Sequence, residues 1–179
     1  MIKIAGGIFR SRIIEVPPSL DVPTKSIVRT AIGNALQNDA KGSRALDLFS
    51  GSGAVGIELI SRGASSAVFS DVSSEAVTYI KKNLATLKIT GSEVYQGDYS
   101  FVLATLASKK DSFDIIFLDP PYKLISSYEE ATAFILSHNL LKEHGILVYE
   151  HEGEVPLPSG FMETRTYNYG RTLVNIFRR

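Results

Sequence analysis

Short apolar segments alternate with longer helical segments from Arg44 to Glu150, and no other feature constrains the fold as strongly. The apolar segments predict five strands: Ala45–Phe49, Ser66–Ser70, Ser92–Gln96, Asp114–Leu118 and Gly145–Glu150. Between them lie segments that predict helices: Ala54–Arg62, Ser74–Leu87, Tyr99–Lys109 and Ser127–Leu141. Strands separated by helices of this length form a parallel sheet with helices on both of its faces.

The pattern changes after Pro158. Two β-rich segments, Phe161–Tyr167 and Thr172–Arg178, are separated by only four residues that include Gly170. They predict an antiparallel pair. Five parallel strands followed by such a pair is the plan of a Rossmann-like α/β fold, the seven-stranded sheet of class I methyltransferases.

The first 22 residues predict a separate short element. Ile2–Ala5 and Arg12–Val16 are rich in β-formers and are joined through two glycines, which favours a hairpin or an extended arm. We expect residues 1–22 to form this arm and residues 23–179 to form the methyltransferase domain. Thr24 is expected to cap a helix that runs to about Asn38.

Composition limits the class of protein. Hydrophobic residues make up 44% of 179 residues, which is enough for the core of one domain. The chain has no cysteine, so disulfides and thiolate metal sites are excluded. The longest apolar runs are too short to cross a bilayer, and the N-terminus lacks the layout of a signal peptide. We therefore expect a soluble cytoplasmic protein.

The net charge of zero hides an asymmetry. Residues 1–44 hold seven Lys and Arg against three Asp and Glu, whereas residues 45–179 hold twelve against sixteen. A basic front end on an acidic body favours contact with a polyanion, although an ordinary charged surface explains the same numbers.

A glycine loop follows the first predicted strand. Asp47 lies in that strand, Phe49 and Ser50 follow, and Gly51 and Gly53 precede the helix that is expected near Ala54. The Gly-x-Gly-x-x-Gly spacing also fits dinucleotide binding. However, the Asp47 carboxylate would repel a pyrophosphate and attract the ammonium of S-adenosylmethionine, so the loop favours that cofactor.

Two more acids follow the next two strands. Asp71 comes where doubly wound folds place the carboxylate that binds ribose hydroxyls, and Asp98 is suited to accept a hydrogen bond from the adenine amino group. Each acid is also suited to cap the helix that follows it. Acids at successive strand ends predict one shared crevice.

The fourth strand runs directly into Asp119-Pro120-Pro121-Tyr122. The prolines fix φ and leave carbonyls free as acceptors. If Asp119 and the Pro120 carbonyl each accept one N–H of an exocyclic amine, its lone pair can turn toward the methyl donor. Tyr122 is expected to stack on the flipped base. The tetrapeptide predicts amino methylation, for which no metal is required. The scattered His138, His144 and His151 are expected to be surface or core residues and not metal ligands.

This motif leaves the acceptor open. Adenine-N6 methyltransferases share it, and glutamine methyltransferases carry Asn in place of Asp119. A DNA enzyme normally has an added recognition domain, for which this chain has no room. A third alternative is a degenerate, non-catalytic RNA-binding module, against which the intact Asp119 and Tyr122 argue.

The chain resembles the RsmD-like family of bacterial methyltransferases, which modify N2 of a guanine in 16S ribosomal RNA. The resemblance covers nearly the whole chain and is carried by these segments: Ile4–Gly7 with Arg10 and Arg12, Pro23-Thr24 with Arg29, Leu46–Glu58, Asn83-Leu84, Asp119–Tyr122 and Tyr169–Thr172.

The resemblance implies roles for these segments. The loop from Asp47 to Gly53, with Asp71 and Asp98, would hold S-adenosylmethionine, and Asp119–Tyr122 would hold the guanine. The basic arm would lie on RNA, so we expect RNA contacts from Arg10, Arg12, Lys25 and Arg29. The expected partner is ribosomal RNA, within a 30S particle or an assembly intermediate, bound by a monomer.

The chain departs from the family at several positions. Val22 replaces an Arg, Ser26-Ile27 replaces Asp-Arg, and Ser11 replaces the glycine between the two basic residues of the arm. Asp71 is more often Glu in the family. The changes around Thr24 affect the expected RNA placement more than cofactor binding.

Overall fold

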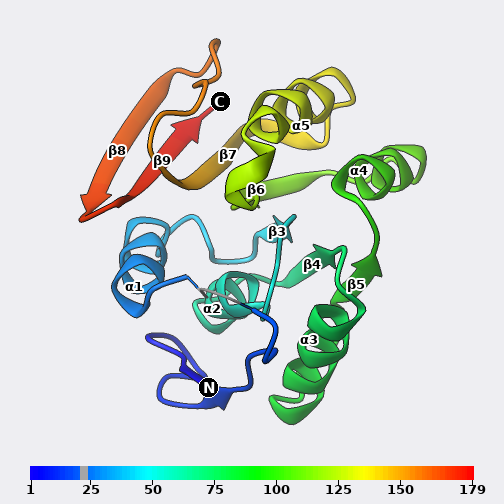
Figure 1. Ribbon diagram of the computed structural model, residues 1–179, viewed down its shortest axis with the longest axis vertical. Helices are drawn as coiled ribbons and strands as arrows, with labels where there is room; N and C mark the ends of the chain where they lie inside the picture. The colour runs from blue at the N-terminus through cyan, green and yellow to red at the C-terminus, as the bar shows by residue number, and fades with distance from the viewer. Residues whose placement is uncertain (21–23) are drawn as a thin grey trace.

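The computed structural model describes residues 1–20 and 24–179, except for the side chain of Tyr122. Its centre is a seven-stranded sheet in the order β5-β4-β3-β6-β7-β9-β8 (Figure 1). The strands are β3 (Arg44–Asp47), β4 (Ser66–Asp71), β5 (Glu93–Gln96), β6 (Phe113–Leu118), β7 (Leu141–Glu152), β8 (Glu163–Tyr169) and β9 (Thr172–Arg178). β3 to β7 run parallel, and β9 is antiparallel to both of its neighbours. The predicted sheet is confirmed.

Helices cover both faces of the sheet (Figure 1). One face carries α1 (Ser26–Ala35), α2 (Ala54–Ser61) and α3 (Ser74–Thr86), and the other carries α4 (Tyr99–Ser108) and α5 (Ser126–Ser137). The inward residues of the parallel strands are apolar on both sides, as a sheet buried between two layers of helices requires. Each face therefore has its own core.

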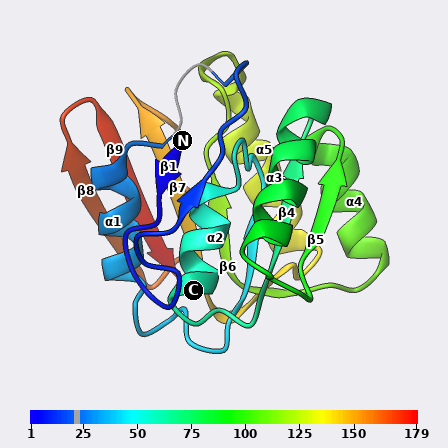
Figure 2. The same cartoon turned by 90° about the horizontal axis from the view of Figure 1, so that it is seen from below.

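The N-terminal arm is a hairpin that packs on the domain. β1 (Ile2–Lys3) pairs antiparallel with β2 (Ile13–Ile14), and three isoleucines of the arm are buried in the core beneath α1, α2 and α3. Figure 2 shows the hairpin on the same side of the sheet as these helices. The buried Glu58 carboxylate accepts the backbone N–H groups of Ala5 and Gly6, both at 2.9 Å. The arm is thus fixed to α2. The predicted domain boundary at residues 22 and 23 lies outside the described residues.

Two predicted helix boundaries are wrong. α1 begins at Ser26 with Lys25 in the cap position and no side-chain capping bond, so Thr24 is not its cap, and the helix ends at Ala35 instead of Asn38. α5 ends at Ser137, and Asn139 then takes a φ of 55°, a left-handed conformation that asparagine tolerates well. Leu141 consequently begins β7 instead of ending the helix.

The other predicted elements are confirmed with boundary shifts of one or two residues at most ends. β7 is longer than predicted and extends to Glu152 at the carboxyl end. None of the described helices is long and apolar enough to cross a membrane.

Candidate active site

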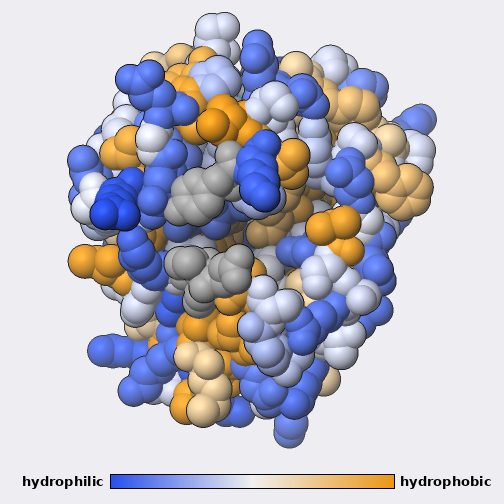
Figure 3. All heavy atoms as spheres, viewed as in Figure 1, coloured by the Kyte–Doolittle hydropathy of each residue, from blue (hydrophilic) through white to orange (hydrophobic). Residues whose placement is uncertain are grey.

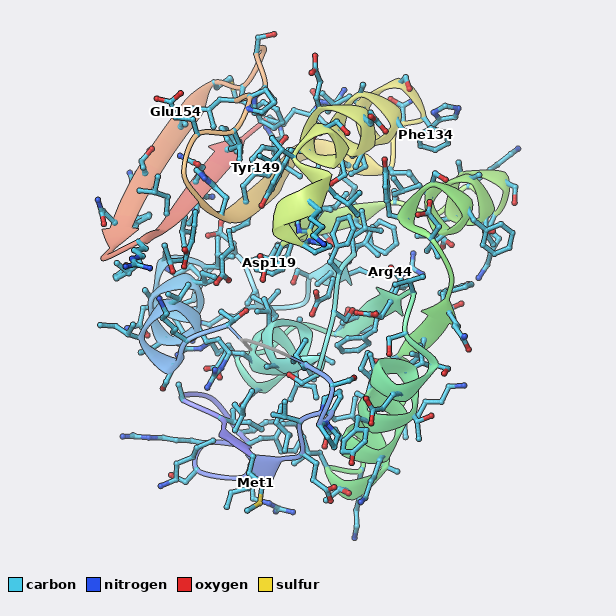
Figure 4. The ribbon with its side chains drawn as sticks, in the orientation of Figure 1. Met1, Arg44, Asp119, Phe134, Tyr149 and Glu154 are labelled. Carbon is cyan, nitrogen blue, oxygen red and sulfur yellow. The ribbon has the colours of Figure 1, made fainter. Side chains whose placement is uncertain are left out.

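A cavity of about 590 Å³ opens where the parallel strands end. Its walls come from the loops after β3, β4, β5 and β6, from the end of β7, and from the residues just before α1. The face in Figure 3 is hollowed near its centre, and Figure 4 places Asp119 in the same region. Doubly wound sheets bind their ligands at this edge, so the cavity lies where the sequence predicts the crevice.

The glycine loop forms one wall. Gly51 and Gly53 have φ values of 53° and 77°, which side chains with a Cβ rarely adopt. Asp71 holds this loop, since its Oδ2 accepts the Gly51 N–H at 2.8 Å and its Oδ1 accepts the Ser73 N–H at 2.9 Å. The Ser50 hydroxyl donates to the Asp47 carbonyl oxygen at 2.6 Å. Asp71 and Ser50 therefore shape the loop, and Ser73, not Asp71, caps α3.

Asp47 lies beneath the loop and is only 2% exposed. Its Oδ2 accepts the Gly56 N–H at 3.0 Å, whereas its buried Oδ1 has no hydrogen-bond partner among the described residues. Burial raises the pKa of Asp47 to about 7. A buried carboxylate oxygen without a partner is costly unless a donor arrives with a ligand. The ammonium of S-adenosylmethionine is such a donor, so these residues fit that cofactor.

Asp98 and Phe49 lie on the wall beside the loop. Asp98 caps α4, because its Oδ1 accepts the Ser100 N–H at 2.9 Å and the Ser100 hydroxyl at 2.7 Å. The helix-cap interpretation is thus confirmed, and the exposed carboxylate still lines the cavity. The Phe49 ring lies 5.5 Å from the Tyr99 ring and gives this wall an apolar surface.

Asp119 is half-buried at the cavity and follows β6 directly (Figure 4). Burial, and then the charges of Glu150 and Asp47, raise the pKa of Asp119 well above its usual value. Pro120 and Pro121 line the cavity as well. The backbone of Tyr122 begins a single 3-10 turn, η1 (Tyr122–Leu124). The predicted stacking of Tyr122 on the base involves the Tyr122 side chain, which lies outside the described part of the structure.

The predicted RNA-binding residues do not lie together. Arg10 and Arg12 are exposed near the tip of the hairpin, which Phe9 ties to the carboxyl end of α2 through Ser61 Oγ at 2.9 Å. The cavity lies at the amino end of the same helix. An eight-residue helix is about 12 Å long, so the arm and the cavity are separate surfaces. Lys25 lines the cavity, with Nζ 3.8 Å from Glu152 Oε1.

Arg29 contradicts its predicted role as a surface RNA contact. It is 4% exposed, because it lies on the face of α1 that packs against the domain. Its guanidinium donates to the backbone carbonyls of Thr24 and Lys3. Arg29 therefore joins the start of α1 to the arm and is not available to a ligand at the surface.

Sequence reasoning missed Glu150. This glutamate lies at the carboxyl end of β7, is 6% exposed and lines the cavity. Its Oε2 is buried and has no hydrogen-bond partner among the described residues. Burial raises the pKa of Glu150 to about 7. The signal was present in the sequence, since an acid that ends an apolar strand is the same pattern that identifies Asp47. His151, expected to be a surface or core residue, is buried beside it and also lines the cavity.

Comparisons with known proteins find relatives that match most of the chain. The family model described as Conserved hypothetical protein 95 matches residues 2–178. YlbH of Bacillus subtilis is 38% identical over 161 residues, covering 88% of this chain and 87% of YlbH. Ribosomal RNA small subunit methyltransferase D of Escherichia coli K12 is 33% identical over 159 residues, covering 88% and 78%.

Solved structures show the same architecture. The Escherichia coli protein yhhF superimposes with a TM-score of 0.87 at 30% identity, covering 99% of this chain and 97% of yhhF. Methyltransferases solved with S-adenosylhomocysteine or AdoMet share the fold at identities of 14% and 20%. The fold is that of class I methyltransferases, as the alternation of strands and helices predicts.

Proposed function

The chain belongs to the Conserved hypothetical protein 95 family, and from this membership and the geometry of the cavity we propose that it is an S-adenosylmethionine-dependent methyltransferase of ribosomal RNA. The finer proposal is transfer to the exocyclic N2 of a guanine in 16S ribosomal RNA. The resemblance to the RsmD-like family supports this acceptor, and so do relatives named as small-subunit methyltransferases. One observation carries the chemistry: Asp119, Pro120 and the unpartnered oxygen of Asp47 face a single cavity.

The cavity divides into a cofactor side and an acceptor side. On the cofactor side, Asp47 Oδ1 would accept the ammonium, and Asp71 would accept ribose hydroxyls with the lone pairs that its loop bonds leave. Asp98 would accept the adenine amino group next to the Phe49 ring. When bound, S-adenosylmethionine supplies a methyl group activated by its sulfonium.

On the acceptor side, the protein aims an amine at that methyl group. Asp119 accepts one N–H and the Pro120 carbonyl accepts the other, so the nitrogen lone pair leaves the ring plane. The nitrogen would take the methyl group of the bound cofactor as the carbon–sulfur bond breaks, and Asp119 would take up the proton that the nitrogen loses. The raised pKa of Asp119 suits it to hold this proton, because a general base works best when its pKa lies near the working pH.

The experiment is transfer of labelled methyl groups to 16S ribosomal RNA, 30S particles, DNA and protein, followed by digestion and separation of the methylated products. N2-methylguanine from RNA is the expected product. N6-methyladenine would favour the adenine-N6 alternative, and label in DNA or protein but never in RNA would overturn the proposal. Cofactor binding without transfer to any substrate would favour the non-catalytic alternative.

The same experiment tests the context of the substrate. We expect a monomer that acts in the cytoplasm on an assembled or partly assembled 30S particle, because a chain this small offers little surface to recognise a site alone. Transfer to naked 16S RNA at the same rate as to 30S particles would contradict this expectation.

A further inference from the structure

Glu150 is a second carboxylate at the acceptor side of the cavity. Leu118 of β6 pairs with Tyr149 of β7, so the residues that follow them, Asp119 and Glu150, emerge side by side at the same edge of the sheet. Both line the cavity, and the charge of Glu150 contributes to the raised pKa of Asp119. Asp119 orients the amine and takes its proton in the proposed transfer, whereas Glu150 takes no part in it.

The position of Glu150 is fixed by its backbone. Its carbonyl oxygen accepts the Tyr128 hydroxyl, and it pairs with Val174 in the β7–β9 ladder. Such a rigid support holds a side chain in place for recognition, as a functional group requires.

The groups around Glu150 satisfy only part of its carboxylate. Burial raises the pKa of Glu150 and outweighs a hydrogen bond with Thr24 and the charges of Arg29 and Lys25, which act to lower it. Arg29 donates to the backbone carbonyls of Thr24 and Lys3, and Lys25 lies nearest to Glu152 and the Thr172 hydroxyl. The Oε2 atom of Glu150 remains without a hydrogen-bond partner among the described residues. A buried acceptor without a partner is costly, and a ligand that brings a donor removes this cost.

We propose that Glu150 selects guanine, by accepting the N1–H of the base whose 2-amino group Asp119 holds. This inference rests on the proposed function and names the residue that sets its specificity. Guanine presents two adjacent kinds of donor, N1–H and the 2-amino group, to a pair of carboxylates. Adenine and cytosine place a ring-nitrogen lone pair beside their amino group, and that lone pair would face the Glu150 carboxylate.

The raised pKa of Glu150 is consistent with this role. Burial raises the pKa of Glu150 to about 7, so the isolated site is easily protonated, whereas an N1–H donor favours the ionised carboxylate. Guanine would therefore be recognised by a group that becomes an acceptor as the base binds.

The test combines a change of the target base with a substitution of Glu150. The substrate is 16S ribosomal RNA that carries either guanine or 2-aminopurine at the methylated position. 2-Aminopurine keeps the 2-amino group but has a lone pair at N1. For the wild type, we expect kcat/KM for guanine to exceed that for 2-aminopurine by about 100-fold or more, as sites built around a substrate hydrogen bond discriminate strongly.

In Glu150→Gln, the amide can turn its NH2 toward the N1 lone pair of 2-aminopurine. We expect the ratio of the two kcat/KM values to fall by about 10-fold or more. The ratio is independent of the fraction of folded protein, and the missing O6 of 2-aminopurine affects both enzymes alike. Glu143→Gln removes the same charge from an exposed position at the other end of β7, away from the cavity, and should leave the ratio unchanged.

Equal losses on both substrates, with the wild-type ratio kept, would assign Glu150 a structural role and overturn the inference alone. A wild type that methylates no guanine would overturn the proposed function itself. The two failures are therefore distinguishable.

Discussion

At the residue scale, the main feature is that three carboxylates line one cavity. Burial is the larger cause of the raised pKa of Asp47, Asp119 and Glu150. Neighbouring charges add to it: Glu150 and Asp47 act on Asp119, Asp47 acts on Glu150, and Asp71 acts on Asp47. No core needs such a group, since apolar residues of similar size would pack without the cost of burying charge. Their position at the ends of three neighbouring strands indicates function, since a ligand that carries several donors would supply the missing partners.

Asp119→Ala should separate chemistry from cofactor binding. The variant loses the acceptor that orients the amine and takes its proton, so we expect kcat to fall at least about 100-fold. Cofactor affinity, measured by calorimetry, should change little because Asp47 and the glycine loop remain. Asp114→Ala, at the amino end of the same strand and away from the cavity, is the control and should keep its turnover. Lost cofactor affinity with unchanged turnover would contradict the role of Asp119.

Ser11 shows how a departure from the family pattern appears in the backbone. It has a φ of 68°, a left-handed conformation in which a Cβ is unfavourable, and the family carries glycine there. We expect Ser11→Gly to raise the free energy of unfolding by about 0.5–1 kcal/mol, measured by urea denaturation. Thr78→Gly, in the exposed middle of α3, should instead lower it by about 0.3–0.5 kcal/mol, because glycine is the poorer helix former. A destabilised Ser11→Gly would show that the strain is relieved elsewhere.

At the scale of elements, the order of strands and helices followed from the sequence because the apolar period is clear in each segment. The errors lie where a local rule competed with tertiary packing. Thr24 has the right chemistry for a helix cap, yet it lies at the cavity wall while Lys25 takes the cap position. Asn139 ends α5 by its left-handed conformation, which no periodicity reports.

Part of the site could also be predicted from the sequence. Acids at strand ends such as Asp71 and Asp119 could be found from their position, because parallel strands end at one edge, whereas Glu150 was missed. Arg29 could not be assigned from sequence, since an arginine at a helix start is equally suited to the surface and to a buried bond with backbone carbonyls. Only the packing of α1 decides between the two.

The N-terminal hairpin is the element whose exposed arginines are predicted to contact RNA. Arg10→Ala combined with Arg12→Ala removes two exposed charges without touching the bonds that fix the arm to Glu58. We expect weaker RNA binding and a plot of log K against log salt that is shallower by about 1.4–1.8. Lys109→Ala with Lys142→Ala removes as many charges from exposed ion pairs elsewhere and serves as the control. An unchanged salt slope in the arm variant would remove the arm from the RNA interface.

At the scale of the whole molecule, the fold buries its acids on one face. The side chains of Asp47 and Glu150 alternate with those of Leu46 and Tyr149, so they point to the side of α1 and α2 and line the cavity at the carboxyl ends of the strands. The architecture thus concentrates the cost of buried charge in the site and leaves the opposite core, between the sheet and α4 and α5, apolar.

This concentration makes the stability of the unliganded protein depend on pH. Asp47 and Glu150 have a pKa of about 7 in the folded chain, against about 4 for such groups in an unfolded one. Between about pH 4 and pH 7 the folded state binds more protons, so the free energy of unfolding should fall as the pH rises through this window. Groups with a lowered pKa, such as Asp39 and Glu93, act in the opposite sense, but only at the acidic end of the range.

Asp47→Asn tests this balance between stability and function. The amide cannot ionise, so at pH 8 the variant should be more stable than the wild type, by on the order of 4 kcal/mol at most, since one pKa unit corresponds to about 1.4 kcal/mol. At pH 4 the two proteins should unfold at similar urea concentrations. The same variant should lose the thermal stabilisation that S-adenosylmethionine gives the wild type, because the acceptor for the ammonium has lost its charge. A variant that is less stable than the wild type at pH 8, or that is stabilised equally by the cofactor, would contradict the assignment of Asp47.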